Sequence, residues 1–378
     1  MLIGTPKEIK NHEYRVGLTP ESAAELVAHQ HEVIIEKGAG AGIGADDAAY
    51  VEAGAEMVGT AEEIFFRADM IVKVKEPQPA ERAMLRKGQI LYTYLHLAPD
   101  PEQTKDLVAS GAVCIAYETV TDQTGGLPLL KPMSQVAGRM SIQAGATALE
   151  KSHGGRGVLL GGVPGVMPGR VVVIGGGVVG FNAAQMAVGL GADVTILDRD
   201  PEVLERLGMY FQSQAKTRFS NRANLADSVA SADLVIGAVL IPGAAAPKLV
   251  SREMLGTMKQ GSVLVDVAID QGGCFETSKA TTHEDPIYTV DGIVHYCVAN
   301  MPGGVARTST YALNNVTLPH ALRIANKGWV QALRDDRHLL NGLNVWNGEV
   351  TCEPVANDLG YRYVAPEQAL IAGQEAAA

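Results

Sequence analysis

Short apolar runs alternate with amphipathic stretches over residues 1–120. Short apolar runs predict strands, and Thr19-Pro20-Glu21 predicts a helix start because a hydroxyl cap precedes a proline. The expected strands cover 31–36, 69–75, 89–96 and 112–120, and the expected helices cover 19–29, 79–87 and 101–110. Strands separated by helices favour a parallel sheet with helices on its faces.

The stretch 121–132 contains Gly125-Gly126 and two prolines, so we place a domain boundary there. A second α/β pattern follows, with helices expected over 134–152 and 178–190 and strands over 171–174, 193–198, 234–236 and 263–265. From about Ala306 the pattern is helical and too short for a third domain, so we expect this tail to pack on the first domain. Residues 135–305 would then form one domain inserted in another made of 1–134 and 306–378.

The composition of the 378 residues, 47% hydrophobic and 19% charged, is that of a well-buried globular protein. A net charge of -11 without a long basic run argues against a nucleic-acid surface. Cys114, Cys274, Cys297 and Cys352 are scattered without a metal-binding spacing, so we expect free thiols in a reducing compartment and no metal. Charge near the N-terminus and the lack of a bilayer-length apolar run predict a cytoplasmic location without a membrane segment.

The segment Gly175–Gly180 fits the pattern Gly-x-Gly-x-x-Gly between an expected strand and an expected helix. The first glycine permits a tight turn, the second lets the backbone approach a pyrophosphate, and the third brings helix and strand together. Asp198 ends the next strand, where a carboxylate accepts hydrogen bonds from an adenosine ribose. The predicted fold class is therefore α/β with two domains, a Rossmann-type NAD-binding domain inserted in a discontinuous α/β substrate domain.

A second glycine-rich segment, Gly40–Ala45, satisfies a relaxed form of the same pattern. Here the following helix starts at about Ala45-Asp46-Asp47, after the glycines rather than through them. No second strand ends in an acid at the required distance, so a loop is the better interpretation.

Polar side chains follow several expected strands, where parallel α/β sheets bind ligands. Lys75 and His96 end two strands of the first domain, and Asp270 follows the strand near 263–267. Taken singly, Lys75 and Arg15 would be surface charges, His96 a rim residue and Asp270 a turn residue. Their joint placement predicts one crevice between the domains, next to a nicotinamide.

Several segments carry a resemblance to a known family. Gly4–Val16, Val72–Pro77, Tyr92–Ala98, Lys131–Ser134, the glycine motif, Val267–Gly273 and Asn300–Gly303 closely resemble alanine dehydrogenases. The chain is thus similar, over nearly its whole length, to the alanine dehydrogenase/pyridine nucleotide transhydrogenase family. The resemblance implies oxidative deamination of L-alanine to pyruvate and ammonia with reduction of NAD, the reverse reductive amination, and a homohexamer.

The resemblance also implies roles for individual residues. Arg15 and Lys75 would hold the substrate carboxylate and carbonyl, since an arginine fork suits a carboxylate and a lysine supplies a point charge. His96 would be the general acid and base, and Asp270 would orient water and ammonia at the imine stage. The implied cofactor positions are Ser134, Gly175, Gly177, Val178, Val179, Gly180, Asp198, Ser220, Val239, Leu240, Ile269, Asp270, Asn300 and Met301.

The nearest rival is the NAD-binding component of a proton-translocating transhydrogenase, which resembles this chain at its N-terminus and glycine motif. That component generally lacks counterparts of Lys75 and His96, because it binds no amino acid. A saccharopine-type dehydrogenase resembles these motifs less, and a noncatalytic protein would not explain polar residues at strand ends. The sequence leaves open whether 2-aminobutyrate or serine also reacts, and in which direction the cell runs the reaction.

Overall fold

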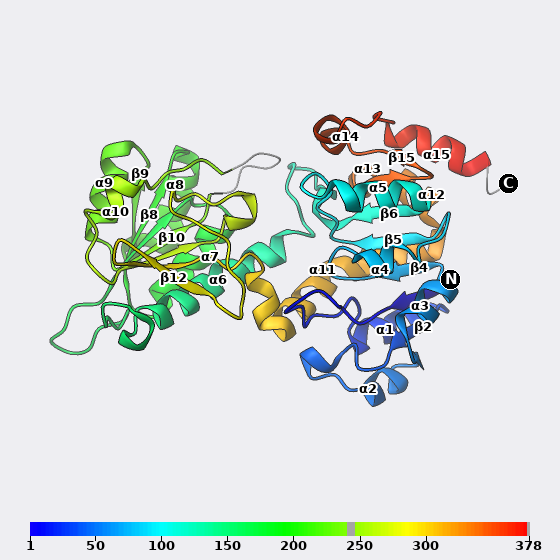
Figure 1. Ribbon diagram of the computed structural model, residues 1–378, viewed down its shortest axis with the longest axis horizontal. Helices are drawn as coiled ribbons and strands as arrows, with labels where there is room; N and C mark the ends of the chain where they lie inside the picture. The colour runs from blue at the N-terminus through cyan, green and yellow to red at the C-terminus, as the bar shows by residue number, and fades with distance from the viewer. Residues whose placement is uncertain (240–245, 376–378) are drawn as a thin grey trace. The chain divides into compact units, whose positions relative to one another are not determined.

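The computed structural model describes residues 1–239 and 246–375, which form two compact units (Figure 1). Unit 1 comprises Met1–Pro132 and Val305–Ala378, and unit 2 comprises Met133–Gly304. In Figure 1 the blue and the orange-to-red ends of the chain share unit 1, whereas unit 2 runs from green to yellow. Each unit has its own sheet, so the predicted fold class, two α/β domains with one inserted in the other, is confirmed.

The sheet of unit 1 has the strand order β15-β14-β6-β5-β4-β1-β2-β3. Its strands are β1 (Leu2–Thr5), β2 (Glu32–Glu36), β3 (Glu56–Val58), β4 (Met70–Val72), β5 (Ile90–Thr93), β6 (Val113–Ala116), β14 (Leu343–Trp346) and β15 (Glu349–Val350). Strands β1 to β6 pair in parallel, as the alternation of strands and helices predicted, although β1 and β3 were not among the expected strands.

The C-terminal tail is part of unit 1, but it is not purely helical as expected. Strand β14 pairs antiparallel with β6, and β15 pairs antiparallel with β14, so the tail extends the sheet. The helical pattern after Ala306 masked this hairpin because its strands are very short. The turn between them contains Asn347 with φ 48 and Gly348 with φ 89, the positive values that tight hairpins require.

Helices cover both faces of this sheet. They are α1 (Pro20–Ala28), α2 (Asp47–Glu52), α3 (Ala61–Arg67), α4 (Pro79–Arg82), α5 (Pro101–Ser110), α11 (Ala306–Lys327), α12 (Trp329–Asp335), α13 (Arg337–Leu340), α14 (Glu353–Leu359) and α15 (Pro366–Glu375). One core cluster joins Phe65 of α3, Leu107 of α5 and Val355 of α14 to the strands. On α11, the carbonyl of Thr317 accepts a 3.3 Å hydrogen bond from Tyr92 Oη of β5. The returning chain is thereby tied to the middle of the sheet.

Unit 2 is built on a sheet of order β12-β13-β11-β10-β7-β8-β9. Its strands are β7 (Arg170–Ile174), β8 (Asp193–Asp198), β9 (Ala215–Phe219), β10 (Leu234–Gly237), β11 (Val263–Asp266), β12 (Ile287–Val290) and β13 (Ile293–Tyr296). All pair in parallel except β12, which pairs antiparallel with β13 at the edge.

The helices of unit 2 are α6 (Lys131–Ala148), α7 (Val178–Gly189), α8 (Pro201–Phe211), α9 (Arg222–Ser231) and α10 (Arg252–Leu255). On β7, Val171 and Val173 pack in one core cluster with α6, α7 and α8. Val172 and Ile174 pack in a second cluster with α9 and α10. Because successive strand residues point to opposite faces, a run of apolar residues such as Val171–Ile174 of β7 is buried on both. Of the helices in the described part of the chain, none combines the length and the apolar character that a bilayer crossing requires.

Candidate active site

In the sheet of unit 1, the direction in which successive strands are added changes between β1 and β4. From β1 the chain continues to β2 and β3 on one side, and from β4 it continues to β5 and β6 on the other. In open α/β sheets, ligands bind at such a switch point, outside the carboxyl ends of the strands. Arg15 lies on the segment that leaves β1, and Lys75 lies on the segment that leaves β4.

Both Lys75 and His96 lie beyond the strands that were expected to contain them. Strand β4 ends at Val72 and β5 ends at Thr93, so the expected ranges 69–75 and 89–96 were too long. The two loops stay side by side, since Tyr94 N still donates a hydrogen bond of 3.3 Å to Val74 O. In these loops the backbone N–H groups of Val74 and His96 donate to side-chain carboxylates rather than to a neighbouring strand.

Arg15 is held by Glu13 in a buried ion pair. The guanidinium donates from Nε to Glu13 Oε1 at 2.6 Å and from Nη2 to Glu13 Oε2 at 2.5 Å. Arg15 is only 2% exposed, so its planar group is fixed in direction as well as in place. Although burial opposes it, contact with Glu13 raises the pKa of Arg15, which therefore stays cationic. A fixed guanidinium is suited to a planar carboxylate.

Lys75 is a largely buried cation with a weak partner. Its Nζ lies 3.9 Å from Glu76 Oε2, beyond hydrogen-bond distance. Burial lowers the pKa of Lys75, and the charges of Arg15 and Lys10 lower it further, whereas Glu76 opposes the shift. Two cations that repel each other in this way mark a place where an anion is stabilised.

His96 has a backbone conformation that is uncommon for a residue with a side chain, with φ 50. Its N–H donates to Glu118 Oε1 at 2.6 Å, and Leu95 N donates to the same oxygen at 3.1 Å. The imidazole Nδ1 lies 4.0 Å from Glu118 Oε1, and the ring stacks on Tyr94 at 5.8 Å between centroids. The side chain is 40% exposed, so the ring remains accessible to a ligand.

The three predicted residues of unit 1 form one cluster. Arg15 acts electrostatically on both Lys75 and Tyr94, and the Tyr94 ring stacks on His96. Tyr94 is itself fixed, because its buried hydroxyl donates to Leu129 O at 2.7 Å. Two cations and an imidazole around a buried aromatic ring can bind a small anionic substrate and exchange a proton with it.

In unit 2 the glycine motif forms the turn between β7 and α7. Gly175 has φ 100, and a Cβ on it would lie 2.7 Å from Ala238 O, so only glycine fits. A Cβ on Gly180 would lie 1.7 Å from Gly175 O, because helix and turn touch there. A Cβ on Gly177, at the N-terminus of α7, would meet nothing within 4 Å. The turn is therefore closed toward the sheet and open above the helix N-terminus, as a pyrophosphate cradle requires.

Asp198 ends β8 and contacts the glycine turn. Its Oδ2 accepts a hydrogen bond from Gly176 N at 2.6 Å, and its Oδ1 accepts one from Asp200 N at 2.9 Å. These bonds fix the carboxylate beside the cradle, while the neighbouring Arg199 is exposed.

The other predicted cofactor residues of unit 2 mostly follow the carboxyl ends of its parallel strands. Ser220 follows β9, Val239 follows β10, Ile269 and Asp270 form a turn after β11, and Asn300 and Met301 come after β13. Val178 and Val179 begin α7, and Ser134 lies near the start of α6. Helix α6 packs closely on α7, since a Cβ on Gly138 would lie 2.3 Å from Val179 O. Leu240 lies outside the described residues.

Asp270 is presented by a loop that a buried carboxylate organises. Asp266 at the end of β11 accepts hydrogen bonds from Ala268 N at 3.1 Å, Cys274 N at 2.9 Å and Phe275 N at 3.3 Å. Gly273 has φ 76, and a Cβ there would lie 2.7 Å from Asp266 Oδ2. Through these bonds Asp266 holds the two ends of the loop together. Asp270, between them, is exposed.

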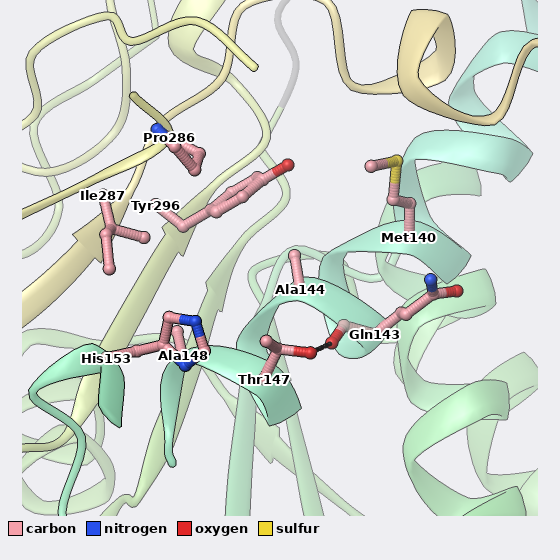
Figure 2. A pocket seen from close by; sticks show the side chains of 9 residues that line it. All are labelled: Met140, Gln143, Ala144, Thr147, Ala148, His153, Pro286, Ile287 and Tyr296. Atoms are coloured by element: carbon pink, nitrogen blue, oxygen red, sulfur yellow. Dashed lines mark hydrogen bonds between the residues drawn. The ribbon is translucent and has the colours of Figure 1, made fainter. Parts of the chain in front are cut away.

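The remaining sequence features do not form a further site. At the second glycine segment, α2 begins at Asp47 behind an Asp46 cap, so the loop interpretation is confirmed. A cavity of about 230 Å³ in unit 2 is lined by α6 and β12 and by His153 and Tyr296, and it includes no predicted site residue (Figure 2). Among the described residues, no group of His, Cys, Asp or Glu is arranged to hold a metal.

Four residues of the unit 1 cluster were not identified from the sequence: Glu8, Glu13, Tyr94 and Glu118. Each of them contacts a predicted residue through its side chain. Tyr94 and Glu13 gave a local signal, since each lies two positions from a predicted residue, His96 and Arg15 respectively.

Two family models match the chain. The model described as "Alanine dehydrogenase/PNT, N-terminal domain" matches residues 4–137, and "Alanine dehydrogenase/PNT, C-terminal domain" matches residues 141–353. Among curated relatives, an alanine dehydrogenase of Halomonas elongata is 60% identical over 96% of this chain and 98% of its own. An alanine dehydrogenase of Bacillus subtilis is 58% identical over 98% of each chain.

Among solved structures, one of an L-alanine dehydrogenase is more similar to this chain than one of a transhydrogenase. A structure of an L-alanine dehydrogenase superposes with a TM-score of 0.93 at 52% identity, covering 95% of this chain and 99% of its own. A transhydrogenase from Sinorhizobium meliloti gives a TM-score of 0.79 at 27% identity, covering 93% and 98%. The rival considered from sequence is thus a more distant relative.

Proposed function

Because the chain belongs to the alanine dehydrogenase/PNT family, we propose that it catalyses the reversible oxidative deamination of L-alanine to pyruvate and ammonia with NAD. The observation that carries this proposal is the cluster of Arg15, Lys75 and His96 at the switch point of unit 1. A module that only binds nucleotides has no use for two buried cations beside an accessible imidazole.

In this proposal Arg15 binds the substrate carboxylate and Lys75 binds the carbonyl or the adjacent carboxylate oxygen. The Glu13 contact supports the first role, because it leaves the guanidinium charged and fixed in the buried pocket. The lowered pKa of Lys75, caused first by burial, supports the second, since an anionic substrate would relieve its repulsion with Arg15.

His96 transfers the proton between substrate and solvent. Its ring is partly exposed, and Glu118 fixes its backbone and lies 4.0 Å from Nδ1. Asp270, on the loop organised by Asp266, orients the water and ammonia that add to and leave the imine carbon.

We propose that unit 1 is the substrate domain and unit 2 the NAD-binding domain. The bounds expected from the sequence (1–134 and 306–378; 135–305) lie within two residues of those of the units. The open glycine turn and the carboxylate of Asp198 fit a pyrophosphate and a ribose, respectively. Ser134, Val178, Val179, Ser220, Val239, Leu240, Ile269, Asn300 and Met301 complete the proposed cofactor set. When bound, the nicotinamide supplies the hydride acceptor, and the protein supplies orientation and charge.

We also propose a cytoplasmic homohexamer. The free thiols Cys114, Cys274, Cys297 and Cys352 suit a reducing compartment. Self-association is supported by an exposed apolar hairpin in unit 2, where Val163 and Val166 form an isolated antiparallel bridge. Four large apolar side chains in and beside this hairpin are exposed, Leu159 (68%), Val163 (53%), Val166 (62%) and Met167 (84%), and such a concentration usually marks an interface.

The test is an assay of NADH formation with each standard L-amino acid, using the purified protein. We expect alanine to give the highest kcat/KM, with 2-aminobutyrate and serine slower. The His96→Ala variant serves as the control for contaminating dehydrogenases. Equal or greater activity with a different amino acid, or exchange of hydride between nucleotides without any amino-acid activity, would overturn the proposal.

A further inference from the structure

The carboxylate of Glu8 joins the carboxyl ends of β1 and β4. Its Oε1 accepts hydrogen bonds from Val74 N at 2.7 Å and from Lys75 N at 3.3 Å. Glu8 is 6% exposed, so little water competes for these bonds. The side chain therefore connects the segment that leads to Arg15 with the peptide units that carry Lys75.

A second buried ion pair keeps Glu8 in place. Its Oε2 accepts a hydrogen bond from Lys73 Nζ at 3.1 Å, and Lys73 also donates to Glu81 Oε1 at 2.7 Å. Lys73 is fully buried, and Glu81 is 1% exposed. Burial raises the pKa of Glu8, and the Lys73 ammonium and the Val74 N–H oppose this by stabilising the carboxylate form. Charged acceptors make the stronger hydrogen bonds, so the ammonium strengthens the hold on the backbone.

The carbonyl side of the same segment is fixed as well. Tyr117 Oη donates to Lys73 O at 3.0 Å, and Thr93 Oγ1 donates to Lys75 O at 3.0 Å. At the far end of the loop, Gln78 N donates to Glu81 Oε2 at 2.7 Å. Around Lys75, several backbone groups therefore form hydrogen bonds with side chains. Glu8 accepts those of the Val74 and Lys75 N–H groups.

We propose that Glu8 is a positioning residue for Lys75, which fixes the origin of the lysine side chain so that its ammonium reaches the substrate. This inference rests on the substrate-binding role of Lys75 in the proposed function. A lysine has a flexible stem, so the position of its Cα decides how much of its rotamer freedom is compatible with binding. Glu8 does not touch the substrate and acts only through the peptide groups of Val74 and Lys75.

A purely structural role for Glu8 makes a different prediction. Loss of a buried carboxylate would then lower stability and affect all ligands alike. If Glu8 acts through Lys75, its removal raises the KM for pyruvate and lowers kcat, because misplacement of a binding group by about 1 Å costs about 10²-fold. Binding of NADH, which the proposed function assigns to unit 2, would be unchanged.

The experiment is a double-mutant cycle on the full-length enzyme with Glu8→Ala and Lys75→Met. Reductive amination of pyruvate is measured together with the dissociation constant of NADH. Asp233→Asn is the matched control: its carboxylate is also buried and accepts Arg170 N at 2.8 Å and Lys259 Nζ at 2.9 Å, but it holds no site residue. Glu8→Gln, which keeps one acceptor oxygen, is expected to lose about tenfold in kcat/KM, less than Glu8→Ala.

We expect the double variant to be no worse than Lys75→Met within about twofold, since both changes remove the same interaction. Losses that multiply, or full activity of Glu8→Ala beside an inactive Lys75→Met, would overturn the inference. Activity retained by Lys75→Met would instead refute the proposed role of Lys75. If Glu8→Ala does not fold, the cycle is run with Glu8→Gln and the same outcomes decide it.

Discussion

The backbone N–H of His96 donates a 2.6 Å hydrogen bond to Glu118 Oε1, and this bond holds His96 at φ 50. A left-handed conformation at a residue with a side chain costs about 1–3 kcal/mol and persists only where the surroundings impose it. Leu95 N donates to both oxygens of the same carboxylate, at 3.1 Å and 3.2 Å. Glu118 therefore sets both the backbone and the charge environment of the proposed acid and base.

Replacement of His96 by alanine should reduce turnover by about 10²–10⁴-fold, the usual contribution of general acid–base catalysis. NADH binding, followed by fluorescence, should be unchanged. His29→Ala is the matched control, since the side chain of His29, the C-cap residue of α1, is 44% exposed compared with 40% for His96. A His96→Ala enzyme with more than about a tenth of wild-type turnover would be inconsistent with the proposed role.

Replacement of Glu118 by glutamine should lower kcat by about tenfold while leaving NADH binding intact. The amide retains one oxygen for the backbone bonds but loses the charge near His96 Nδ1. Glu36→Gln is a suitable control, because Glu36 is a half-buried glutamate that accepts one backbone bond, from Lys7 N at 2.8 Å. The two variants are compared by steady-state kinetics, and equal kcat values would argue against a role for the Glu118 charge.

The KM for pyruvate should rise at alkaline pH as Lys75 loses its proton. Burial, together with the charges of Arg15 and Lys10, lowers the pKa of Lys75, so this rise begins below the pH of an ordinary lysine. Glu76 stabilises the ammonium, so Glu76→Gln should lower this pKa further and move the alkaline rise to lower pH. The pH dependence of KM in the two enzymes checks the sign, and a shift to higher pH would contradict it.

NAD should be preferred over NADP by at least about 100-fold in kcat/KM, or about 2.7 kcal/mol. Asp198 would face the 2′-phosphate of NADP, and like charges at that distance repel. Asp198→Ala should reduce the preference, mainly through a higher KM for NAD, whereas Asp200→Ala should not. Asp200 is the control because its carboxylate caps α8 by accepting Glu202 N at 2.9 Å. Comparable wild-type efficiency with NADP would mean that the exposed Arg199, rather than Asp198, governs the site.

The exposed hairpin of unit 2 should be required for assembly. A Val166→Asp/Met167→Asp double variant should sediment as a smaller species than wild type, because two charges would be buried without partners. Met209→Asp is the matched control, since Met209 is an exposed methionine of α8 (69%) outside the hairpin. Sedimentation velocity distinguishes the outcomes, and an intact hexamer in the double variant would exclude the hairpin as the interface.

The sequence alone determined the elements with strong local signals. Helix α5 (Pro101–Ser110) and strand β8 (Asp193–Asp198) have the predicted bounds, because the Asp100 and Gly111 caps define the ends of the helix and an aspartate stands at each end of the strand. The glycine motif gave an equally local signal, because its spacing between an apolar run and a helix could be read directly from adjacent residues. The β14–β15 hairpin was missed because pairing with β6, rather than local propensity, makes those short segments strands.

Only the tertiary structure revealed how the candidate site is held. From sequence, Lys75 and His96 were expected at strand ends, yet both lie on loops whose backbone N–H groups bind carboxylates distant in sequence. Glu8 and Glu118 have no local motif, because a buried carboxylate is defined by the groups that fold around it. The hydrophobic periodicity of a sequence shows which face of an element is apolar. The partner of a buried charge depends instead on which segments become neighbours when the sheet assembles.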